Sequence, residues 1–399
     1  MDHPISARLS PGRDSQPALI STSAELEALV ARLALESFVT VDTEFIRERT
    51  YWPQLCLVQI AGEQETAVID ALAPGLDIAP LGRLLADPAV TKVFHAARQD
   101  VEIFLLLFGR VPVPLFDTQV AAMVAGYGDQ VGYDQLVASL TGASIDKAHR
   151  FSDWSARPLS PAQIAYAASD VTHLRTVYER LVARLSREGR DCWVEQEMAA
   201  LADPATYRNE PETMWQRLKS RTSSRRVLGQ LRAIAAWRER EAQRINIPRG
   251  RVLKDEALLE LAASAPASPA ELARVRGINR GFAEGRSGAS LLAAIAAAKT
   301  EPEEALPPAR SARNEHRAEP ALVALLKVLL AAKCADHHVA PRLVASAEEI
   351  ERFAAGGETD LPLLLGWRRE VFGADALALR AGGTALGVDE RGRVKTLPL

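Results

Sequence analysis

The sequence predicts an α/β domain, built on a mixed sheet flanked by helices, followed by all-helical domains. Three stretches rich in β-branched and aromatic residues open the α/β part and predict consecutive strands. These stretches span residues 38–46, 55–60 and 66–70. Strand and helix patterns then alternate as far as residue 187, which is typical of a sheet covered by helices.

Length and composition divide the chain into several parts. At 399 residues it is too long for one ordinary domain. Polar, Pro-containing stretches separate the regular patterns and predict the boundaries. We expect a loose leader over 1–17, an α/β domain over 18–190, a connector over 191–212, a helical domain over 213–299, a linker over 300–318, and a second helical domain with the C-terminal tail over 319–399.

Local signals define the elements in order. Residues 18–20 read as a short strand, and Thr22 with Glu25 has capping-box spacing that opens a helix to Leu35. Further strands are expected over residues 91–96 and 115–117. Further helices are expected over 81–86, 97–108, 118–125, 133–140, 160–187, 215–219, 225–245, 255–263, 269–274, 281–285, 290–299 and within 319–354. The end of the chain, from Gly382, reads as a short hairpin or tail.

Charge is unevenly spread along a chain whose net charge is −3. Residues 217–254 hold twelve Lys and Arg against two Glu, a net charge of +10, so the remainder carries −13. A basic segment beside an acidic body indicates a polyanionic partner, or alternatively a helix face covered with solvated arginines.

The cysteines and the apolar runs limit the cellular setting. Cys56, Cys192 and Cys334 show no C-x-x-C spacing, so neither a zinc site nor a disulfide framework is indicated. No apolar run reaches the length of a membrane span, and the N-terminus lacks a secretory pattern. We therefore expect a cytoplasmic protein without a membrane segment, and nothing indicates an obligate protein partner.

Two carboxylates lie on the first long strand. Successive side chains of a strand alternate between its faces, so Asp42 and Glu44 point the same way. Two neighbouring acids on an otherwise apolar strand repel each other and are costly to bury without a cation. The alternative is a solvated face of an edge strand.

Further acids favour a shared site. Asp100 falls in the first turn of a predicted helix, and Tyr166 and Asp170 lie four residues apart on one face of a later helix. Oxygen ligands suit magnesium or manganese, and two such ions catalyse phosphodiester hydrolysis. We expect Tyr166 to orient the attacking water.

The pattern resembles a known family. D-T-E ending at Glu44, H-x-x-x-x-D ending at Asp100 and Y-x-x-x-D ending at Asp170 are similar to the three exonuclease motifs of the DEDD superfamily, in its DEDDy branch. Residues 41–60, with Asp146-Lys147, Asp153-Trp154 and Arg157-Pro158-Leu159, resemble the ribonuclease D family more specifically.

The resemblance covers residues 18–190 and carries several implications. It implies a ribonuclease H-like fold and 3′→5′ exoribonuclease activity that releases nucleoside 5′-monophosphates, with tRNA precursors bearing 3′ trailers as the typical RNA. It also implies two divalent ions, magnesium or manganese. Carried over residue by residue, the metal ligands are Asp42, Glu44, Asp100 and Asp170, with Tyr166 as the water-orienting residue.

The helical part resembles the helicase-and-ribonuclease-D C-terminal (HRDC) domain. The match lies in residues 213–299, around the phrase from Asn246 to Asp255, and a diverged second copy is expected over 319–399. Such domains bind nucleic acid in relatives.

Basic and aromatic residues outside the acidic set are candidates for RNA contact. They are Lys147, Arg150, Trp154, Arg157, Arg249, Arg251 and Lys254. Trp154 and Phe151 are aromatic candidates for stacking on a base. Core packing is the alternative for Trp154, and a solvated face is the alternative for the basic segment. Two other functions are compatible with the sequence: an RNA-binding protein without catalysis, and a DNA 3′→5′ exonuclease of the same superfamily.

Overall fold

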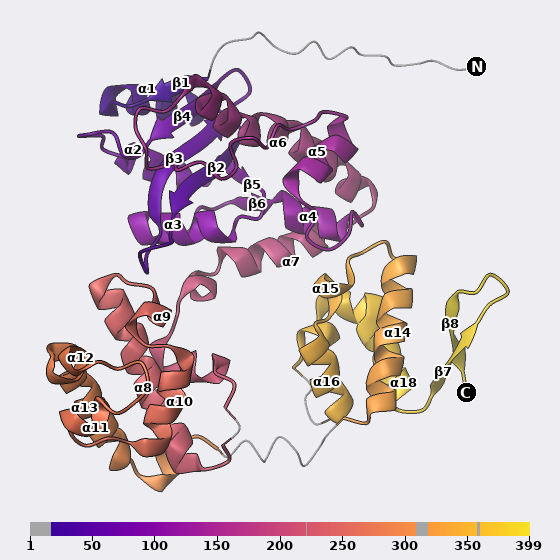
Figure 1. Ribbon diagram of the computed structural model, residues 1–399. Coiled ribbons are helices and arrows are strands. Elements are labelled where there is room, and N and C mark those ends of the chain that lie inside the picture. Colours follow the sequence, from indigo (N-terminus) through magenta and orange to yellow (C-terminus); the bar gives the residue numbers. More distant parts are fainter. Residues whose placement is uncertain (1–16, 221, 309–317, 357–359) are drawn as a thin grey trace, which may run out of the picture. The chain divides into compact units, whose positions relative to one another are not determined.

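The computed structural model describes residues 17–220, 222–308, 318–356 and 360–399. The chain divides into two compact units. The first unit takes in residues 55–118 and 133–180 with the chain before residue 46, and the second takes in 46–54, 119–132 and 181–399. The sheet that dominates the first unit is coloured indigo to purple in Figure 1.

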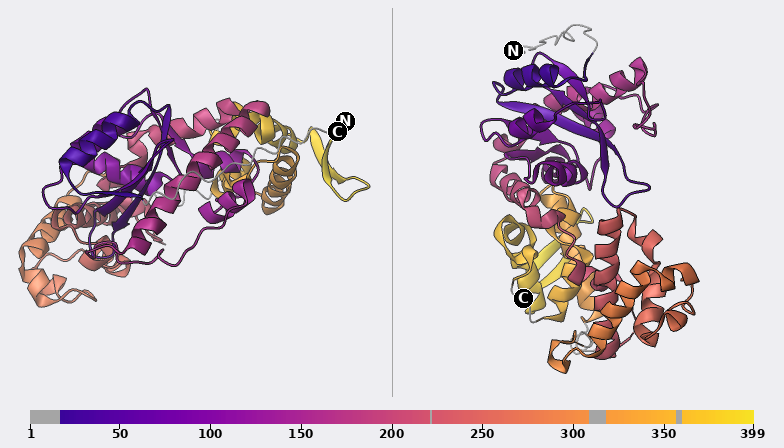
Figure 2. Two further views of the ribbon diagram at one scale, coloured as in Figure 1. Left: turned by 90° about the horizontal axis from the view of Figure 1, so that it is seen from above. Right: turned by 90° about the vertical axis from the view of Figure 1, so that its left-hand side faces the viewer.

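A six-stranded mixed sheet forms the centre of the first unit, in the order β1-β4-β3-β2-β5-β6. The strands are β1 Ala18–Ile20, β2 Phe38–Ile46, β3 Gln54–Ala61, β4 Thr66–Asp70, β5 Thr91–Phe94 and β6 Leu115–Asp117. β3 and β4 pair antiparallel, whereas β1 with β4, β2 with β5, and β5 with β6 pair parallel. Figure 2 shows helices along both faces of this sheet, so the predicted layered α/β arrangement is confirmed.

The alternation of β2 decides which side chains face the longest helix. Val39 and Val41 are fully buried on one face. On the other face the Thr40 hydroxyl donates to the backbone carbonyl of Val171, at 2.8 Å, in helix α6 (Pro161–Arg187). Because Asp42 and Glu44 share the face of Thr40, β2 directs both carboxylates towards α6.

The shorter helices of this part begin and end where the sequence signals lie. Thr22 and Glu25 form the predicted capping box at the start of α1, and Gly109 takes the left-handed conformation (φ 71°) that ends α3. The helices are α1 Ser23–Leu33, α2 Ala79–Leu85, α3 Arg98–Phe108, α4 Thr118–Val124 and α5 Tyr133–Thr141.

The second unit contains a first helical core formed by residues 214–295. Its longest helix, α8 (Arg225–Ile245), is amphipathic and buries Leu231 and Ile234, as its apolar spacing predicts. The other helices of this core are α9 Arg249–Val252, α10 Asp255–Ser264, α11 Pro269–Leu272, α12 Arg280–Glu284 and α13 Arg286–Lys299. The sequence analysis missed the single turn of α9.

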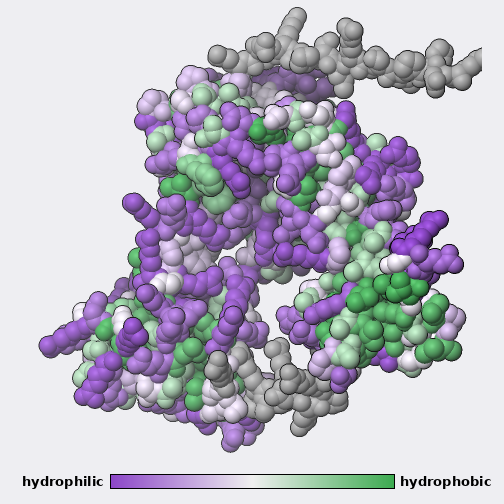
Figure 3. All heavy atoms as spheres, turned by 45° about the vertical axis from the view of Figure 1, so that its right-hand side comes forward, coloured by the Kyte–Doolittle hydropathy of each residue, from purple (hydrophilic) through white to green (hydrophobic). Residues whose placement is uncertain are grey.

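A separate hydrophobic core is formed by residues 326–379. Its elements are α14 Pro320–Asp336, α15 Pro341–Val344, α16 Ala347–Ala355, α17 Gly366–Arg368 and α18 Ala374–Arg380, followed by the antiparallel strands β7 Thr384–Val388 and β8 Val394–Pro398. The expected C-terminal hairpin is therefore present. Figure 3 shows hydrophobic side chains gathered over these C-terminal helices, and Leu325 and Val328 of α14 are each 44% exposed.

The connecting segments show one clear difference from expectation. The segment expected as a connector contains a regular helix, α7 (Asp191–Ala202), which buries Val194 and Met198. The expected leader lies outside the described residues except for residue 17, and residues 309–317 of the expected linker lie outside them as well. None of the described helices is long and apolar enough to cross a membrane.

Candidate active site

Four carboxylates come together from three elements around the interior strand β2. Asp42 and Glu44 belong to β2, Asp100 lies in the first turn of α3, and Asp170 lies on α6. The hydroxyl of Thr43 donates to the Asp100 carboxylate, which links β2 to α3. The structure thus brings together all four acids that the sequence analysis selected.

The mutual influence of these acids shows how close they are. Burial, and then repulsion by Asp100, Asp170 and Glu44, raises the pKa of Asp42 well above its usual range. Burial raises the pKa of Glu44 to about 8, with further repulsion from Asp170 and Asp100. Burial likewise raises the pKa values of Asp100 and Asp170 to about 7 each. The fold therefore holds negative charges where only a cation or protons relieve their repulsion.

Tyr166 faces the same acids from one turn before Asp170 on α6. Burial, followed by the charges of Asp170, Glu44 and Asp42, raises the pKa of its phenol above the usual value. The Tyr166 ring stacks on Trp154 with centroids 6.0 Å apart, and the His149 ring meets it edge-on at 6.2 Å. Its hydroxyl therefore stays protonated at neutral pH, and its ring is held from two sides.

A cleft of about 290 Å³ opens onto these side chains. Its walls include Asp42, Glu44, Tyr166 and Asp170, together with Thr43, His95, Tyr133, Arg150 and Leu174. Asp100 does not line the cleft itself, but it accepts a hydrogen bond from the hydroxyl of Thr43, which does. Arg150 supplies positive charge on the wall. This charge opposes the rise in the pKa of Tyr166.

Tyr133 is a cleft residue that the sequence analysis missed. It starts α5, and its hydroxyl donates to the backbone carbonyl of Ser169 at 3.1 Å, next to Asp170. Its ring centroid lies 5.4 Å from that of His95, whose Nδ1 is 3.0 Å from the Thr118 hydroxyl. No local pattern marks Tyr133, because its role depends on packing against α6.

The chemistry of this donor set fits hard divalent cations. All four donors are carboxylates, the ligand type that magnesium and manganese prefer. Among the described residues no three His, Cys, Asp or Glu side chains are gathered closely enough to form a coordination shell as they stand. The fit therefore rests on the electrostatics. Burial raises the pKa values of all four acids, neighbouring acids add to the rise at Asp42 and Glu44, and a cation would oppose these shifts.

Two residues expected to contact RNA near this cleft are engaged elsewhere. Trp154 is 3% exposed and packs on Tyr166, so its ring face is not available to a base. Arg157 grips Asp70 with Nε at 2.8 Å and Nη2 at 2.5 Å, and also donates to the carbonyl of Cys56. The structure argues against direct RNA contact by either residue, because the Trp154 ring is buried and the Arg157 guanidinium already forms a bidentate ion pair.

Lys147 and Arg150 keep accessible charge. Lys147 forms an ion pair with Asp134 at 2.7 Å but remains 48% exposed, and Arg150 lines the cleft. Both stay candidates for contact with a phosphate.

The basic segment of the second unit, residues 217–254, is partly neutralised within that unit. Arg249 lies 3.4 Å from Glu239, which is 1% exposed. Five arginines of the basic segment form ion pairs among the described residues: Arg232 with Glu301, Arg238 with Asp255, Arg240 with Glu212, Arg244 with Glu241, and Arg249 with Glu239. The net charge of +10 therefore overstates the positive charge that this segment offers to a polyanion.

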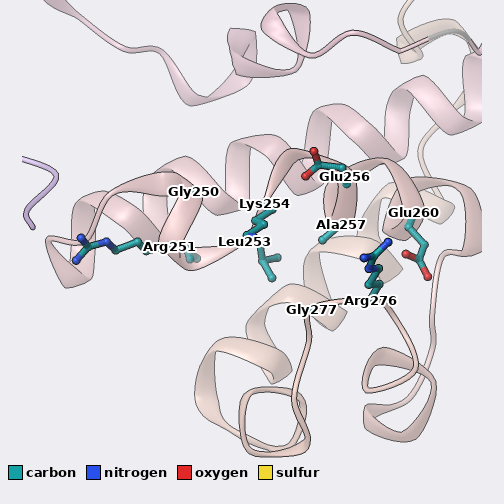
Figure 4. Close-up of a pocket in the computed structure, with 10 residues that line it drawn as sticks. Gly250, Arg251, Leu253, Lys254, Glu256, Ala257, Glu260, Arg276 and Gly277 are labelled. Atoms are coloured by element: carbon teal, nitrogen blue, oxygen red, sulfur yellow. The ribbon is translucent and has the colours of Figure 1, made fainter. Parts of the chain in front are cut away.

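Arg251 and Lys254 differ from these arginines. Both line a second cavity, of about 660 Å³, between the turn of α9 and the start of α10. Figure 4 shows Lys254, Arg276 and Glu260 around this cavity, with Arg251 extended away from them. Neither Arg251 nor Lys254 forms an ion pair in the part of the chain that the structure describes, so both remain candidates for binding RNA.

Comparison with protein families places two regions of the chain. A 3′–5′ exonuclease family model matches residues 17–186, and an HRDC domain model matches residues 228–295. The ribonuclease D of Gluconacetobacter diazotrophicus is 66% identical over 98% of this chain and 100% of its own length. That of Granulibacter bethesdensis is 65% identical over 96% of this chain and 97% of its own length.

Solved structures agree with these relatives. The crystal structure of Escherichia coli RNase D, described as an exoribonuclease involved in structured RNA processing, has a TM-score of 0.78 and 30% identity, covering 92% of this chain and 99% of that one. The catalytic core of RRP6 from Trypanosoma brucei, at 24% identity and a TM-score of 0.53, covers 72% of this chain and 83% of that one and shares the fold.

Proposed function

The chain belongs to the ribonuclease D family and is a 3′→5′ exoribonuclease, and from this premise we propose how it cuts and what it cuts. Exonucleases of this kind use divalent metal ions. We propose that Asp42, Glu44, Asp100 and Asp170 hold two such ions, magnesium or manganese. The observation that carries the proposal is that Asp42, Glu44, Asp170 and Tyr166 line one cleft, while the charge of Asp100 acts on Asp42.

The cleft residues have separate tasks in this proposal. When bound, the ions lower the pKa of a water and offset the charge that develops on the leaving oxygen. The Tyr166 hydroxyl stays protonated, so it acts as a hydrogen-bonding group that orients the water and not as a base. Arg150 on the cleft wall pairs with a phosphate of the RNA, and each cut releases a nucleoside 5′-monophosphate.

For the substrate, we propose tRNA precursors with 3′ trailers, handled in the cytoplasm. The E. coli relative acts in structured RNA processing, and a structured RNA with a short unpaired 3′ end suits an enzyme whose metal-holding cleft is small. The α/β region over 18–190 would cut the 3′ end, while the helical regions over 213–299 and 319–399 would hold the RNA body. Membership of the ribonuclease D family sets aside both a protein without catalysis and a DNA exonuclease.

A trimming assay tests the substrate. Purified full-length protein should shorten a tRNA bearing a 3′ trailer one nucleotide at a time in magnesium, and stop near the mature end where pairing begins. The same tRNA with a hairpin closing its 3′ end should be trimmed at least about tenfold more slowly, because pairing costs a few kcal/mol to undo. Trimming of both RNAs at equal rates would contradict a preference for unpaired 3′ ends.

The cavity of the second unit yields a second prediction. Changing Arg251 and Lys254 together to Ala should weaken binding of tRNA-length RNA roughly tenfold at 0.1 M salt and lower the salt slope by about 1.4, because each phosphate contact contributes about 0.7. Hydrolysis of a very short oligonucleotide should not change. Binding is measured across a salt series with calcium in place of magnesium to suppress cleavage.

A charge-matched variant controls for the general field of the protein. Arg187 and Lys327 are exposed and line neither cavity, so changing both to Ala removes the same charge elsewhere. If both double variants lose the same affinity and slope, Arg251 and Lys254 are merely part of a solvated face.

A further inference from the structure

One aromatic side chain beside the cleft points into solvent. Phe151 is 92% exposed, the highest value among the large apolar side chains that the structure describes. A single exposed apolar residue needs no explanation by itself, so its surroundings decide what it means. Its neighbour Arg150 lines the catalytic cleft and places its guanidinium carbon 5.6 Å from the centre of the Phe151 ring.

The backbone that carries Phe151 is held on both sides. The amide of Arg150 donates to the carbonyl of Lys147 at 3.2 Å, and the amide of Ser152 donates to the carbonyl of His149 at 3.0 Å. Lys147 is in turn paired with Asp134 of α5 at 2.7 Å. The backbone of the turn is therefore held in place, which reduces the entropy lost when a flat ligand stacks on the ring.

Residues on either side of Phe151 also contact the ring of Tyr166. His149, two residues before Phe151, meets the Tyr166 ring edge-on, and Trp154, three residues after it, stacks on that ring. The inward residues of the segment thus fix Tyr166, while Phe151 alone of its aromatic side chains faces outward. Its ring lies one residue from a cleft wall that the end of the RNA must pass.

We propose that Phe151, with Arg150 over one side of its ring, is a stacking platform for an unpaired base of the RNA just upstream of the nucleotide being removed. Arg150 neutralises the adjacent phosphate while the free face of the ring receives the base, a combination that single-strand binders use. The inference rests on the proposed function and adds a residue that sets the preference for unpaired 3′ ends.

The choice of ligand follows from charge and position. The guanidinium of Arg150 lies 5.6 Å from the centre of the ring, and Arg150 also lines the cleft in which the proposed function places the 3′ end of the RNA. A base has a flat face and is joined to a phosphate that can pair with Arg150, whereas an apolar protein segment would offer this cation no counter-charge. Every base has such a face, so the platform should tolerate any sequence.

Variants of Phe151 test the proposal by RNA binding in calcium. Phe151→Ala and Phe151→Leu should weaken binding of an unpaired oligonucleotide about 5- to 150-fold, and Phe151→Trp should bind at least as tightly as the wild type. Leu35→Ala is the matched control, because Leu35 is 89% exposed in the same unit but lies outside the cleft. Wild-type affinity in Phe151→Ala, or equal rescue by Leu and Trp, would overturn the inference.

An abasic scan locates the base. Removing one base at a time from the RNA should reveal one position near the 3′ end whose loss weakens binding to the wild type but not to Phe151→Ala, because the two changes remove the same contact. If base removal and Phe151→Ala lowered the affinity independently at every position of the RNA, the stacking platform would be overturned.

Catalysis separates failure of this inference from failure of the proposed function. A mononucleotide p-nitrophenyl ester has no upstream base, so Phe151→Ala should hydrolyse it at the wild-type rate. Loss of that activity would show that Phe151 supports the catalytic residues instead of an RNA base. A wild-type protein that does not trim the tRNA precursor would contradict the proposed substrate. If the wild type trims it and Phe151→Ala binds RNA as tightly as the wild type, only the stacking platform is contradicted.

Discussion

Replacing Asp42 by Asn is expected to lower RNA hydrolysis by at least about a thousandfold, because the ions that Asp42 helps to hold contribute several kcal/mol of charge stabilisation in the transition state. The wild-type protein should lose its activity equally in excess chelator and regain it with magnesium or manganese. Single-turnover rates on an unpaired oligonucleotide measure both effects. Full wild-type activity in chelator would contradict the metal-dependent mechanism.

The same substitution should not cost stability in chelator. Asp42 is repelled by Asp100, Asp170 and Glu44, so removing its charge relieves strain in the folded state. We expect an equal unfolding midpoint, or one about 2–4 °C higher, at pH 8. A clear drop in the midpoint would mean that Asp42 serves a structural pair.

The pH dependence of stability has a definite sign. In the folded state Asp100 and Asp170 have pKa values of about 7 and Glu44 of about 8, whereas unfolded carboxyls titrate near 4. Between these values the folded state binds more protons, so stability in chelator falls as pH rises from about 4 to about 8. Thermal midpoints across that range should show a smaller fall for Asp42→Asn.

Asp70 provides the matched control for these stability measurements. It is also a buried aspartate, 8% exposed, but Arg157 compensates its charge at 2.5 Å. Asp70→Asn should therefore lower the free energy of unfolding, by about 2 kcal/mol at neutral pH. Loss of stability in Asp70→Asn beside an equal or higher midpoint in Asp42→Asn would separate repulsion at the cleft from a general effect of removing a buried carboxylate.

Tyr166→Phe is expected to lower kcat about a hundredfold or more while leaving RNA affinity within about twofold. The substitution keeps the ring that packs on Trp154 and removes only the hydroxyl that orients the water, an interaction needed in the transition state and not in binding. Binding in calcium and turnover in magnesium measure the two quantities. Lost affinity with normal turnover would show that Tyr166 binds RNA instead.

Tyr133→Phe is the control for removing a phenol from the same cleft. Its hydroxyl is already committed to the Ser169 carbonyl at 3.1 Å, so its loss should change kcat by less than about tenfold. If both variants lost kcat equally, the general polarity of the cleft, and not the position of the Tyr166 hydroxyl, would explain the effect.

The sequence by itself determined the pairs of residues within each element of the acidic site, because local periodicity carried that information. Strand alternation placed Asp42 and Glu44 on one face of β2, and helical spacing placed Tyr166 beside Asp170. The capping box at Thr22 and the stop at Gly109 likewise depend on near neighbours. Each of these features involves residues within one element or one turn.

Only the tertiary structure decided which remaining candidates are free to bind RNA. Trp154 became a support for Tyr166, Arg157 was taken by Asp70, 87 residues away, and Arg232 was taken by Glu301, 69 residues away. Tyr133 packs against α6 and lines the cleft, whereas Phe151 is 92% exposed. Whether a side chain is covered or paired depends on contacts between distant segments, and no local period of the sequence encodes them.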